Sequence, residues 1–480
     1  MTTVVRGLIM LACASLLIAA CTSSPPLRID QQSVDSSYKY TVPPQDDDRW
    51  PTASLDAVGI QQQPLAALVS RIKDNTFPRI YSVLVVKDGK LVFEEYFAGY
   101  HRYRLNEMHS VSKSVTAILV GMAVDQGLMN VDDQVYKFFP DYPGLEWIDR
   151  PYDITVRDLL TMSHGTDWDE RSRPLSDPEN SIRAMIDSDE WLRFTLSHKL
   201  VESPGERFNY AGGMTVLLGE IVHRTSGRDL GDYAQRRLFQ PLDIWIKYWH
   251  RSDRGIVNAQ GGLLLRPRDM AKIGQLMLDN GSWNGNRIVS EMWVRSALQR
   301  HVSAEFGWGY GYQWRLGQAP VGDQLIDMFF AAGRGGQNII VFPTLDLVVV
   351  FTAQPKDNRG GGLRNYTMAL DYVLPAVTGV MPPSPISIDP EKLKRYAGHY
   401  RHSETGHELA VAVESDRLVV QPSDWQRVAF VPVAPDSFSG YWGNVGSIRV
   451  QFSAARADKA QRITARFMFG KRIYERVADD

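Results

Sequence analysis

The sequence predicts an α/β (α+β) domain followed by a smaller all-β module, and three observations support this division. Strand-like segments near residue 83 return near residue 308, and the stretch between Ser110 and about Gly281 is mainly helical. That order is expected when both ends of a domain complete one sheet. The run Pro382-Pro383-Ser384-Pro385 then marks a linker, and the segment beyond it contains short strands with polar turns.

Length and composition fit this arrangement. A chain of 480 residues suggests two or three folded units, and its 44% apolar and 22% charged residues are ordinary for a globular protein. The net charge of −2 gives no electrostatic reason to expect nucleic-acid binding. The only cysteines, Cys13 and Cys21, lie within the first 21 residues. Because no cysteine follows residue 21, a cysteine protease, a cysteine-ligated zinc site and a disulfide scaffold are excluded.

The first 21 residues are predicted to be a lipoprotein signal peptide. Arg6 precedes an apolar run over residues 7–20, which is too short to span a bilayer comfortably. Its end, Leu17-Ile18-Ala19-Ala20-Cys21, resembles the lipobox of bacterial lipoproteins, which implies cleavage before Cys21 and acylation of its thiol. An ordinary signal peptide with an incidental cysteine is the alternative. Residues 22–50 have the polar composition of a flexible tether. We therefore expect an exported protein, lipid-anchored at the periplasmic face of a bacterial membrane.

The first domain, predicted over residues 51–380, opens with a helix and a hairpin. One face of the helix carries four apolar residues, Leu65, Leu68, Val69 and Ile72. The turn Lys87-Asp88-Gly89-Lys90 follows, between two apolar runs, and Asp-Gly in that position is a strong hairpin signal.

Strand character returns after the helical middle and again after the linker. Gly127 and Gly227 are typical stop residues within the helical stretch. Later apolar segments that favour strands cover residues 308–314, 328–331, 338–342 and 347–352. Further short strands are expected within residues 388–480, which predict a separate all-β module.

A serine three residues before a lysine is the candidate catalytic pattern. Serine needs an adjacent base, and on a helix this spacing places both side chains on one face. The chain contains three such pairs, Ser36/Lys39, Ser70/Lys73 and Ser110/Lys113.

The surroundings of the three pairs favour Ser110. Ser36 lies in the polar tether, and Ser70 lies in an amphipathic surface helix where Lys73 would stay solvated. Ser110 alone opens an almost entirely apolar helix, as expected of a buried one. Burial would lower the pKa of Lys113, and the helix N-terminus offers N–H groups to a developing oxyanion.

At this point a family resemblance is visible. His109-Ser110-Val111-Ser112-Lys113-Ser114 resembles the nucleophile motif of the serine β-lactamase and penicillin-binding-protein superfamily. The segments 204–213 and 330–337 resemble its second and third motifs, and Gly261-Gly262-Leu263 lies in a further matching stretch. The resemblance covers residues 55–375 and is closest to class C-like esterases and 6-aminohexanoate-dimer-hydrolase-like proteins. It implies a β-lactamase-like domain with an antiparallel sheet and a helical region.

The resemblance also implies roles for single residues. Ser110 would be acylated, Lys113 would hold or relay its proton, and Tyr210 would be the general base. The oxyanion hole would use the backbone N–H groups of Ser110 and Gln337. Gly335 and Gly336 would belong to the substrate-binding strand, where a substrate backbone comes close.

Two positions depart from the family pattern. The second motif usually ends in Asn, whose amide binds substrate and lysine, but residue 212 is Gly. The third motif usually starts with Lys or His, but residue 334 is Arg. Arginine binds a carboxylate through two hydrogen bonds but cannot transfer protons, because it stays charged. Gly212 and Arg334 would thus be substrate-binding positions that favour a small ester or amide over efficient β-lactam or cell-wall peptide turnover.

We therefore expect a serine hydrolase that cleaves a small-molecule ester or amide through an acyl-enzyme on Ser110. A β-lactam or a D-Ala-D-Ala peptide is the alternative substrate class. The rival from another class is a non-catalytic cell-envelope or peptidoglycan-related binding protein that keeps the fold. The C-terminal module resembles the small lipocalin-like barrels that follow such domains. No metal, cofactor or nucleic-acid partner is predicted.

Overall fold

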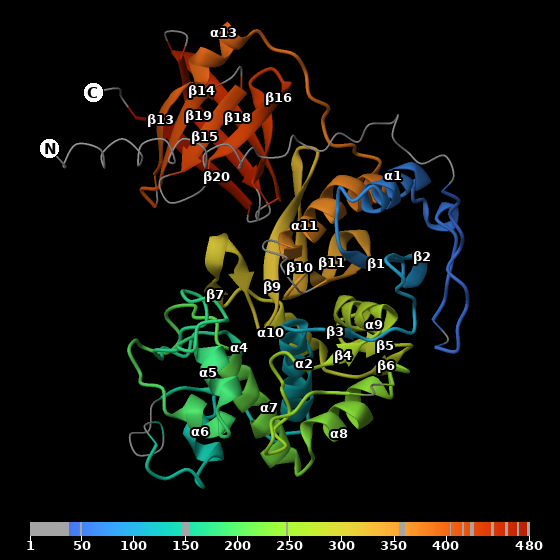
Figure 1. The fold of residues 1–480 in the computed structure, drawn as a ribbon, viewed down its shortest axis with the longest axis vertical. Coiled ribbons are helices and arrows are strands. Elements are labelled where there is room, and N and C mark those ends of the chain that lie inside the picture. Colours follow the sequence, from blue (N-terminus) through green and yellow to red (C-terminus); the bar gives the residue numbers. More distant parts are fainter. Residues whose placement is uncertain are drawn as a thin grey trace, which may run out of the picture. The chain divides into compact units, whose positions relative to one another are not determined.

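The computed structural model describes residues 38–477 apart from 49, 146, 148–152, 246–247, 355–360, 404, 415–416, 423–426, 443–445, 457–458 and 468–469. The chain divides near Pro382 into two compact units (Figure 1). The predicted signal peptide, Cys21 and most of the predicted tether lie outside the described residues.

An eight-stranded antiparallel sheet forms the centre of the first unit. Its order is β2-β1-β12-β11-β10-β9-β8-β7, so the early hairpin lies beside the late strands. The strands are β1 (Ile80–Lys87), β2 (Lys90–Tyr96), β7 (Val302–Ser303), β8 (Gly309–Tyr310), β9 (Arg315–Val321), β10 (Gln324–Gly333), β11 (Gln337–Phe342) and β12 (Leu347–Ala353). The prediction of one sheet completed by both ends of the domain is confirmed.

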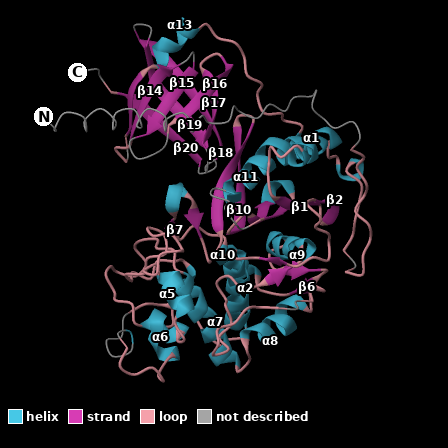
Figure 2. Cartoon of the chain, in the orientation of Figure 1, coloured by secondary structure: helices cyan, strands magenta, loops and turns pink. Residues whose placement is uncertain are grey.

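Helices cover this sheet and form a separate helical region (Figure 2). α9 (Pro267–Leu278) packs against β1, β11 and β12, and α11 (Gly361–Met368) packs against β11. α1 (Gln62–Lys73) and α12 (Leu374–Thr378) pack against each other and against the helical turn Ala369–Val373. The helical region contains α2 (Val111–Asp125), α4 (Val156–Leu160), α5 (Ser181–Asp187), α6 (Trp191–Leu196), α7 (Gly212–Ser226), α8 (Leu230–Ala234) and α10 (Glu291–Ala297). Short pairs β3 (Asn106–Glu107) with β4 (Leu264–Leu265) and β5 (Ser282–Trp283) with β6 (Asn286–Arg287) complete the unit.

The helix α2 is the buried element of the helical region, as its apolar sequence predicts. Every residue from Val111 to Ala123 is buried. Gly121 allows the indole of Trp293 to pack directly on the helix backbone, because a Cβ there would lie 2.3 Å from the ring nitrogen. The other long helix, α7, packs beside α2.

The second unit is a closed eight-stranded antiparallel barrel preceded by α13 (Pro390–Leu393). Its strands are β13 (Gly398–His402), β14 (Glu408–Glu414), β15 (Arg417–Pro422), β16 (Val428–Ala434), β17 (Ser437–Trp442), β18 (Gly446–Arg456), β19 (Lys459–Phe467) and β20 (Gly470–Arg476). Four aromatic rings pack together in this unit, those of Tyr396, Tyr400, Phe438 and Phe452. Closure removes exposed sheet edges, and the expected all-β barrel is confirmed.

Two expectations about local structure are wrong. Ser70 is buried rather than on a surface, and its hydroxyl donates to the Ala66 carbonyl at 3.0 Å. Residues 38–50, assigned to the tether, are packed on the first unit where the structure describes them. Tyr40 donates to the Val92 carbonyl at 2.8 Å, and Trp50 is only 2% exposed.

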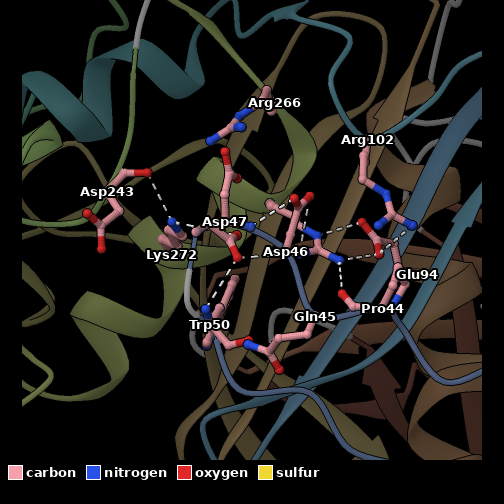
Figure 3. Close-up of polar contacts among 12 residues, drawn as sticks. Pro44, Gln45, Asp46, Asp47, Trp50, Glu94, Arg102, Asp243, Arg266 and Lys272 are labelled. Atoms are coloured by element: carbon pink, nitrogen blue, oxygen red, sulfur yellow. Dashed lines mark hydrogen bonds and ion pairs between the residues drawn. The ribbon is translucent and has the colours of Figure 1, made fainter.

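A buried ion-pair network fixes this N-terminal segment (Figure 3). Arg268 of α9 donates to both Glu94 oxygens, at 2.8 and 2.7 Å, and to the Pro44 carbonyl at 2.9 Å. Asp48 lies 3.4 Å from the same guanidinium and 3.7 Å from Lys272. The side chains of Arg268 and Glu94 are only 3% and 1% exposed. One arginine therefore joins the N-terminal segment, β2 and α9.

Among the residues that the structure describes, none of the helices is both long and apolar enough to cross a bilayer.

Replacing Arg268 with alanine should lower the free energy of unfolding by about 3–5 kcal/mol, because Glu94 would stay buried without its main partner. Urea denaturation at pH 7 measures the change. Arg295→Ala is the matched control, since its ion pair with Glu291 is exposed and should contribute less than about 0.5 kcal/mol. Equal denaturation midpoints for the two variants would contradict this role of Arg268.

Candidate active site

Ser110 lies at the N-terminus of the buried helix α2, in a loop held from two sides. Residues 106–107 pair with β4, and the Met108 N–H donates to the Leu263 carbonyl at 2.8 Å. His109, immediately before Ser110, has a φ of +47°, in the left-handed region that residues other than glycine seldom occupy. Such strain clusters at functional sites, where the surrounding structure enforces it. The loop thus presents a half-buried hydroxyl at a helix N-terminus.

Lys113 is one turn further along α2 and is only 2% exposed. Its ammonium donates to Ser110 Oγ at 3.3 Å, which is the contact that the sequence spacing predicts. It also donates to the backbone carbonyl of Gln260 at 2.9 Å and to the side-chain Oε1 of Gln260 at 3.0 Å. An ammonium has three hydrogens to donate, so these three neutral oxygens match its full capacity.

The ring of Tyr210 lies beside this lysine, just before α7 begins. Lys113 Nζ is 4.9 Å from the ring centroid, and the Arg171 guanidinium is 4.2 Å from it. Arg315 is third, at 5.7 Å. Three cations therefore surround one largely buried phenol ring, within the range of cation–π attraction.

Glu305 balances part of that positive charge. Its carboxylate pairs with Arg171 at 3.3 Å and with Arg315 at 3.2 Å. Burial alone would raise the pKa of Glu305, but Arg315 and Arg171 outweigh it and hold that pKa below its ordinary value. No motif in the sequence marks this group, because Arg171 lies 134 residues before Glu305 and 144 residues before Arg315.

A buried histidine fixes the segment that carries Tyr210. The Thr166 N–H donates to His164 Nδ1 at 3.1 Å, so the opposite ring nitrogen, Nε2, carries the proton and donates to the Asn209 carbonyl at 3.0 Å. Burial lowers the pKa of His164 to about 4, and the hydrogen bond to Asn209 opposes this only in part. His164 is therefore neutral and positions Asn209 and its neighbour Tyr210.

Gly212 is the first residue of α7, and the side chains of Ile182, Glu170 and Gln260 occupy the space beside it. Its N–H donates to Glu170 Oε2 at 2.7 Å. A Cβ on residue 212 would lie 2.6 Å from Ile182 Cδ1 and 3.2 Å from Gln260 Oε1. Sequence reasoning missed Glu170 and Gln260. Gln260 directly precedes the matching stretch Gly261-Gly262-Leu263, but nothing in the sequence marks it as a contact of Lys113.

The third motif forms the hairpin between β10 and β11. β10 pairs with β9 only up to Phe330, so residues 331–333 extend beyond that pairing. Gly333 lies against the loop of the nucleophile, since a Cβ there would be 2.2 Å from the Met108 carbonyl oxygen. Gly335 and Gly336, expected on the strand, are turn residues with φ of +83° and +104°, a region that favours glycine. Their close approach to a substrate backbone stays a prediction.

Arg334 and Gln337 occupy different surroundings in that hairpin. Arg334 is exposed, and its charge lies close enough to His109 to lower the pKa of that buried imidazole, after burial itself and against the charge of Glu107. Gln337 starts β11 opposite Gly333, and its side chain donates to the Ala353 carbonyl at 2.5 Å. The role of its backbone N–H in an oxyanion hole stays a prediction.

Comparison with known proteins agrees with this geometry. Residues 78–372 match the family model described as Beta-lactamase, and the chain belongs to that family of hydrolases. Residues 382–475, which cover the barrel, match a domain of unknown function, DUF3471.

Two curated relatives and one solved structure show how far the similarity extends. The 6-aminohexanoate-dimer hydrolase of Paenarthrobacter ureafaciens is 26% identical over 319 aligned residues, and the match covers 62% of this chain and 77% of that protein. The lovastatin esterase of Penicillium rubens is 25% identical over 36% of this chain and 46% of its own length. The octameric penicillin-binding protein homologue from Pyrococcus abyssi has a TM-score of 0.51 and 20% identity, covering 86% of this chain and 99% of that one. That last likeness concerns the fold alone.

His164 predicts an acid-dependent loss of stability. Above its ordinary pKa of 6.5 the imidazole is neutral in both folded and unfolded chains, so it adds no pH dependence there. As the pH falls from 6.5 towards 4, only the unfolded chain takes up the proton. This term should cost about 2–3 kcal/mol between pH 7 and 4.5.

Urea denaturation of the wild type and of His164→Gln at both pH values measures this term. The variant should lose less stability on acidification, whereas His399→Gln, at an exposed histidine, should behave like the wild type. The same loss in His164→Gln and the wild type would show that His164 takes up its proton in the folded protein too.

Proposed function

We propose that the protein is a serine hydrolase that cleaves a small ester or amide through an acyl-enzyme on Ser110. The observation that carries this proposal is the 3.3 Å contact between Lys113 Nζ and Ser110 Oγ at the start of a buried helix. The family and the names of its relatives, a 6-aminohexanoate-dimer hydrolase and a lovastatin esterase, support hydrolysis as the reaction.

In the proposed first half-reaction, Ser110 Oγ attacks the substrate carbonyl carbon. The hydroxyl proton passes to Tyr210 as general base, with Lys113 holding Oγ or relaying the proton. The resulting tetrahedral intermediate collapses when the bond to the leaving group breaks. The alcohol or amine leaves with that proton, and the acyl group stays on Ser110.

In the second half-reaction, water replaces the leaving group and releases the carboxylic acid. Tyr210 takes a proton from the water and returns it to Oγ as the acyl bond breaks. The oxyanion of both intermediates is placed at the N-terminus of α2. There it would accept hydrogen bonds from the Ser110 N–H and from the hairpin, with Gln337 as the predicted second donor.

The charge around the site favours a substrate that carries a carboxylate. The exposed guanidinium of Arg334 has no partner among the residues that the structure describes, and its charge is felt at His109 beside the nucleophile. An arginine binds a carboxylate through two parallel hydrogen bonds. We infer that Arg334 binds an anionic group of the substrate outside the reacting bond.

We also infer that the protein works at a membrane surface, to which the thiol of Cys21 would attach it. The basic start, the short apolar run and the lipobox-like ending at Cys21 support this.

Ser110→Ala should abolish labelling by a fluorophosphonate probe and lower the hydrolysis of short nitrophenyl esters by at least about 10⁴-fold, because no other group replaces the nucleophile. Labelling is measured by mass spectrometry of the intact protein, and hydrolysis by absorbance. Ser70→Ala is the matched control, since it alters the buried serine of a different Ser-x-x-Lys pair.

Ser70→Ala should retain wild-type labelling and turnover. Equal labelling of the wild type and Ser110→Ala would contradict the proposed nucleophile. No labelling and no turnover even in the wild type would favour the non-catalytic binding protein.

Arg334→Ala should raise KM about 10-fold for an ester that carries a carboxylate and less than about 2-fold for its neutral analogue, because it removes a charged hydrogen bond. Arg334→Lys keeps the positive charge but lacks the planar guanidinium, so its KM for the carboxylate ester should lie between those of the wild type and Arg334→Ala. Steady-state kinetics on the paired substrates measure the effect. The same change in KM for both substrates would contradict carboxylate binding by Arg334.

A further inference from the structure

Gln260 is the residue through which Lys113 is joined to the rest of the protein. It supplies two of the three acceptors of the ammonium, one from its backbone and one from its side chain. The third acceptor is the nucleophile itself. When two hydrogens of the ammonium are bound by Gln260, the remaining direction of Nζ points to Ser110 Oγ. Gln260 thus sets the orientation of the group that faces the nucleophile.

The loop that carries Gln260 is fixed to the same helix as the catalytic pair. Thr116 Oγ1 donates to the Ala259 carbonyl at 2.9 Å, and the Leu263 N–H donates to Ser112 Oγ at 3.3 Å. Both hydroxyls are fully buried in α2. The backbone on both sides of Gln260 is therefore fixed to the helix that carries Lys113.

The orientation of the Gln260 amide follows from the chemistry of its neighbour. Lysine has donors and no acceptor, so the amide must present its oxygen to Nζ rather than its NH₂ group. A neutral oxygen orients the ammonium without the strong ion pair that a carboxylate would form in a buried site.

Gln260 also lies where the side chain of residue 212 would begin. Its Oε1 is 3.2 Å from the Cβ that a larger residue at position 212 would have. An amide on residue 212 and the amide of Gln260 would therefore compete for one place beside Lys113. The absence of a side chain at Gly212 leaves this space to Gln260, together with Ile182 Cδ1 and Glu170 Oε2, which would lie 2.6 and 3.1 Å from that Cβ.

We propose that Gln260 is the positioning residue for Lys113. Its amide oxygen, held by the 258–263 loop, accepts the hydrogen bond from Lys113 that an asparagine at position 212 of α7 could otherwise accept. This inference rests on the proposed hydrolase function. Gly212 and Gln260 then depend on each other: the glycine leaves room for the glutamine, and only one amide oxygen contacts Lys113.

The experiment compares Gln260→Ala, Gln260→Asn and the double variant Gln260→Ala/Gly212→Asn in the full chain. Gln260→Ala should lower kcat and the rate of fluorophosphonate labelling of Ser110 about 10- to 100-fold, with KM changed less than 2-fold. Gln260→Asn keeps the amide but withdraws it by one methylene, so it should lose activity without a change in melting temperature. The backbone carbonyl of residue 260 remains in all variants.

The double variant moves the amide to position 212 and should recover at least about 10-fold of the loss. A merely structural role for Gln260 would not produce that recovery. Gln275→Ala, at a buried glutamine of α9 that donates to Asp279, is the matched control and should keep wild-type kinetics.

Two results separate the possible failures. If Ser110 is labelled and all Gln260 variants react at the wild-type rate, the positioning role is wrong and the hydrolase function stands. If Ser110 is not labelled in the wild type, the hydrolase function is wrong and the inference falls with it. A folded double variant that recovers no activity would also overturn the inference.

Discussion

The hydrogen bonds of the buried Lys113 ammonium are the interaction on which the site depends. A cation with 2% exposure is unfavourable unless its donors are matched. Three oxygens within 3.3 Å supply that match, and each comes from an element that the fold must hold in place. The burial of α2, the hydrogen-bonded loop at Gln260 and the strained turn at His109 together hold this lysine against a serine hydroxyl.

The sheet supplies the second constraint, which is a backbone close to the nucleophile. Gly333 approaches the Met108 carbonyl so closely that no side chain fits, and the turn that follows needs positive φ at Gly335 and Gly336. The hairpin can occupy that place because β11 and β12 lie fully buried in the middle of the sheet. The ion pairs of Arg268 hold the N-terminal segment against the same sheet from α9 and β2. The site is thus held by segments far apart in sequence, namely the N-terminal segment with β2 and the late strands β10 to β12.

Local patterns made the sheet, the barrel and the Ser110–Lys113 contact predictable from the sequence. Two residues one helical turn apart meet whatever the rest of the chain does, and an Asp-Gly turn specifies its own hairpin. Gln260 is 147 residues from Lys113, and the Glu305 cluster joins segments at similar separations, so no spacing rule reaches them. Residues 38–50 look like a tether by composition, yet buried partners such as Glu94 and Arg268 hold them. Polar composition predicts disorder only where such partners are absent.

The two departures from the family pattern have different physical meanings. Gly212 by itself would suggest a site in decay, because the amide expected there is missing. The structure instead places another amide oxygen on the same lysine, in the space that a larger residue 212 would need. A protein that had lost its activity would have no reason to retain a substitute amide oxygen on Lys113 together with Ser110 and Tyr210. Arg334 is different, because its exposed positive charge acts on His109 beside the nucleophile and has no ion-pair partner among the described residues. Under the proposals made above, one departure conserves the contacts of Lys113, and the other changes what the site can bind.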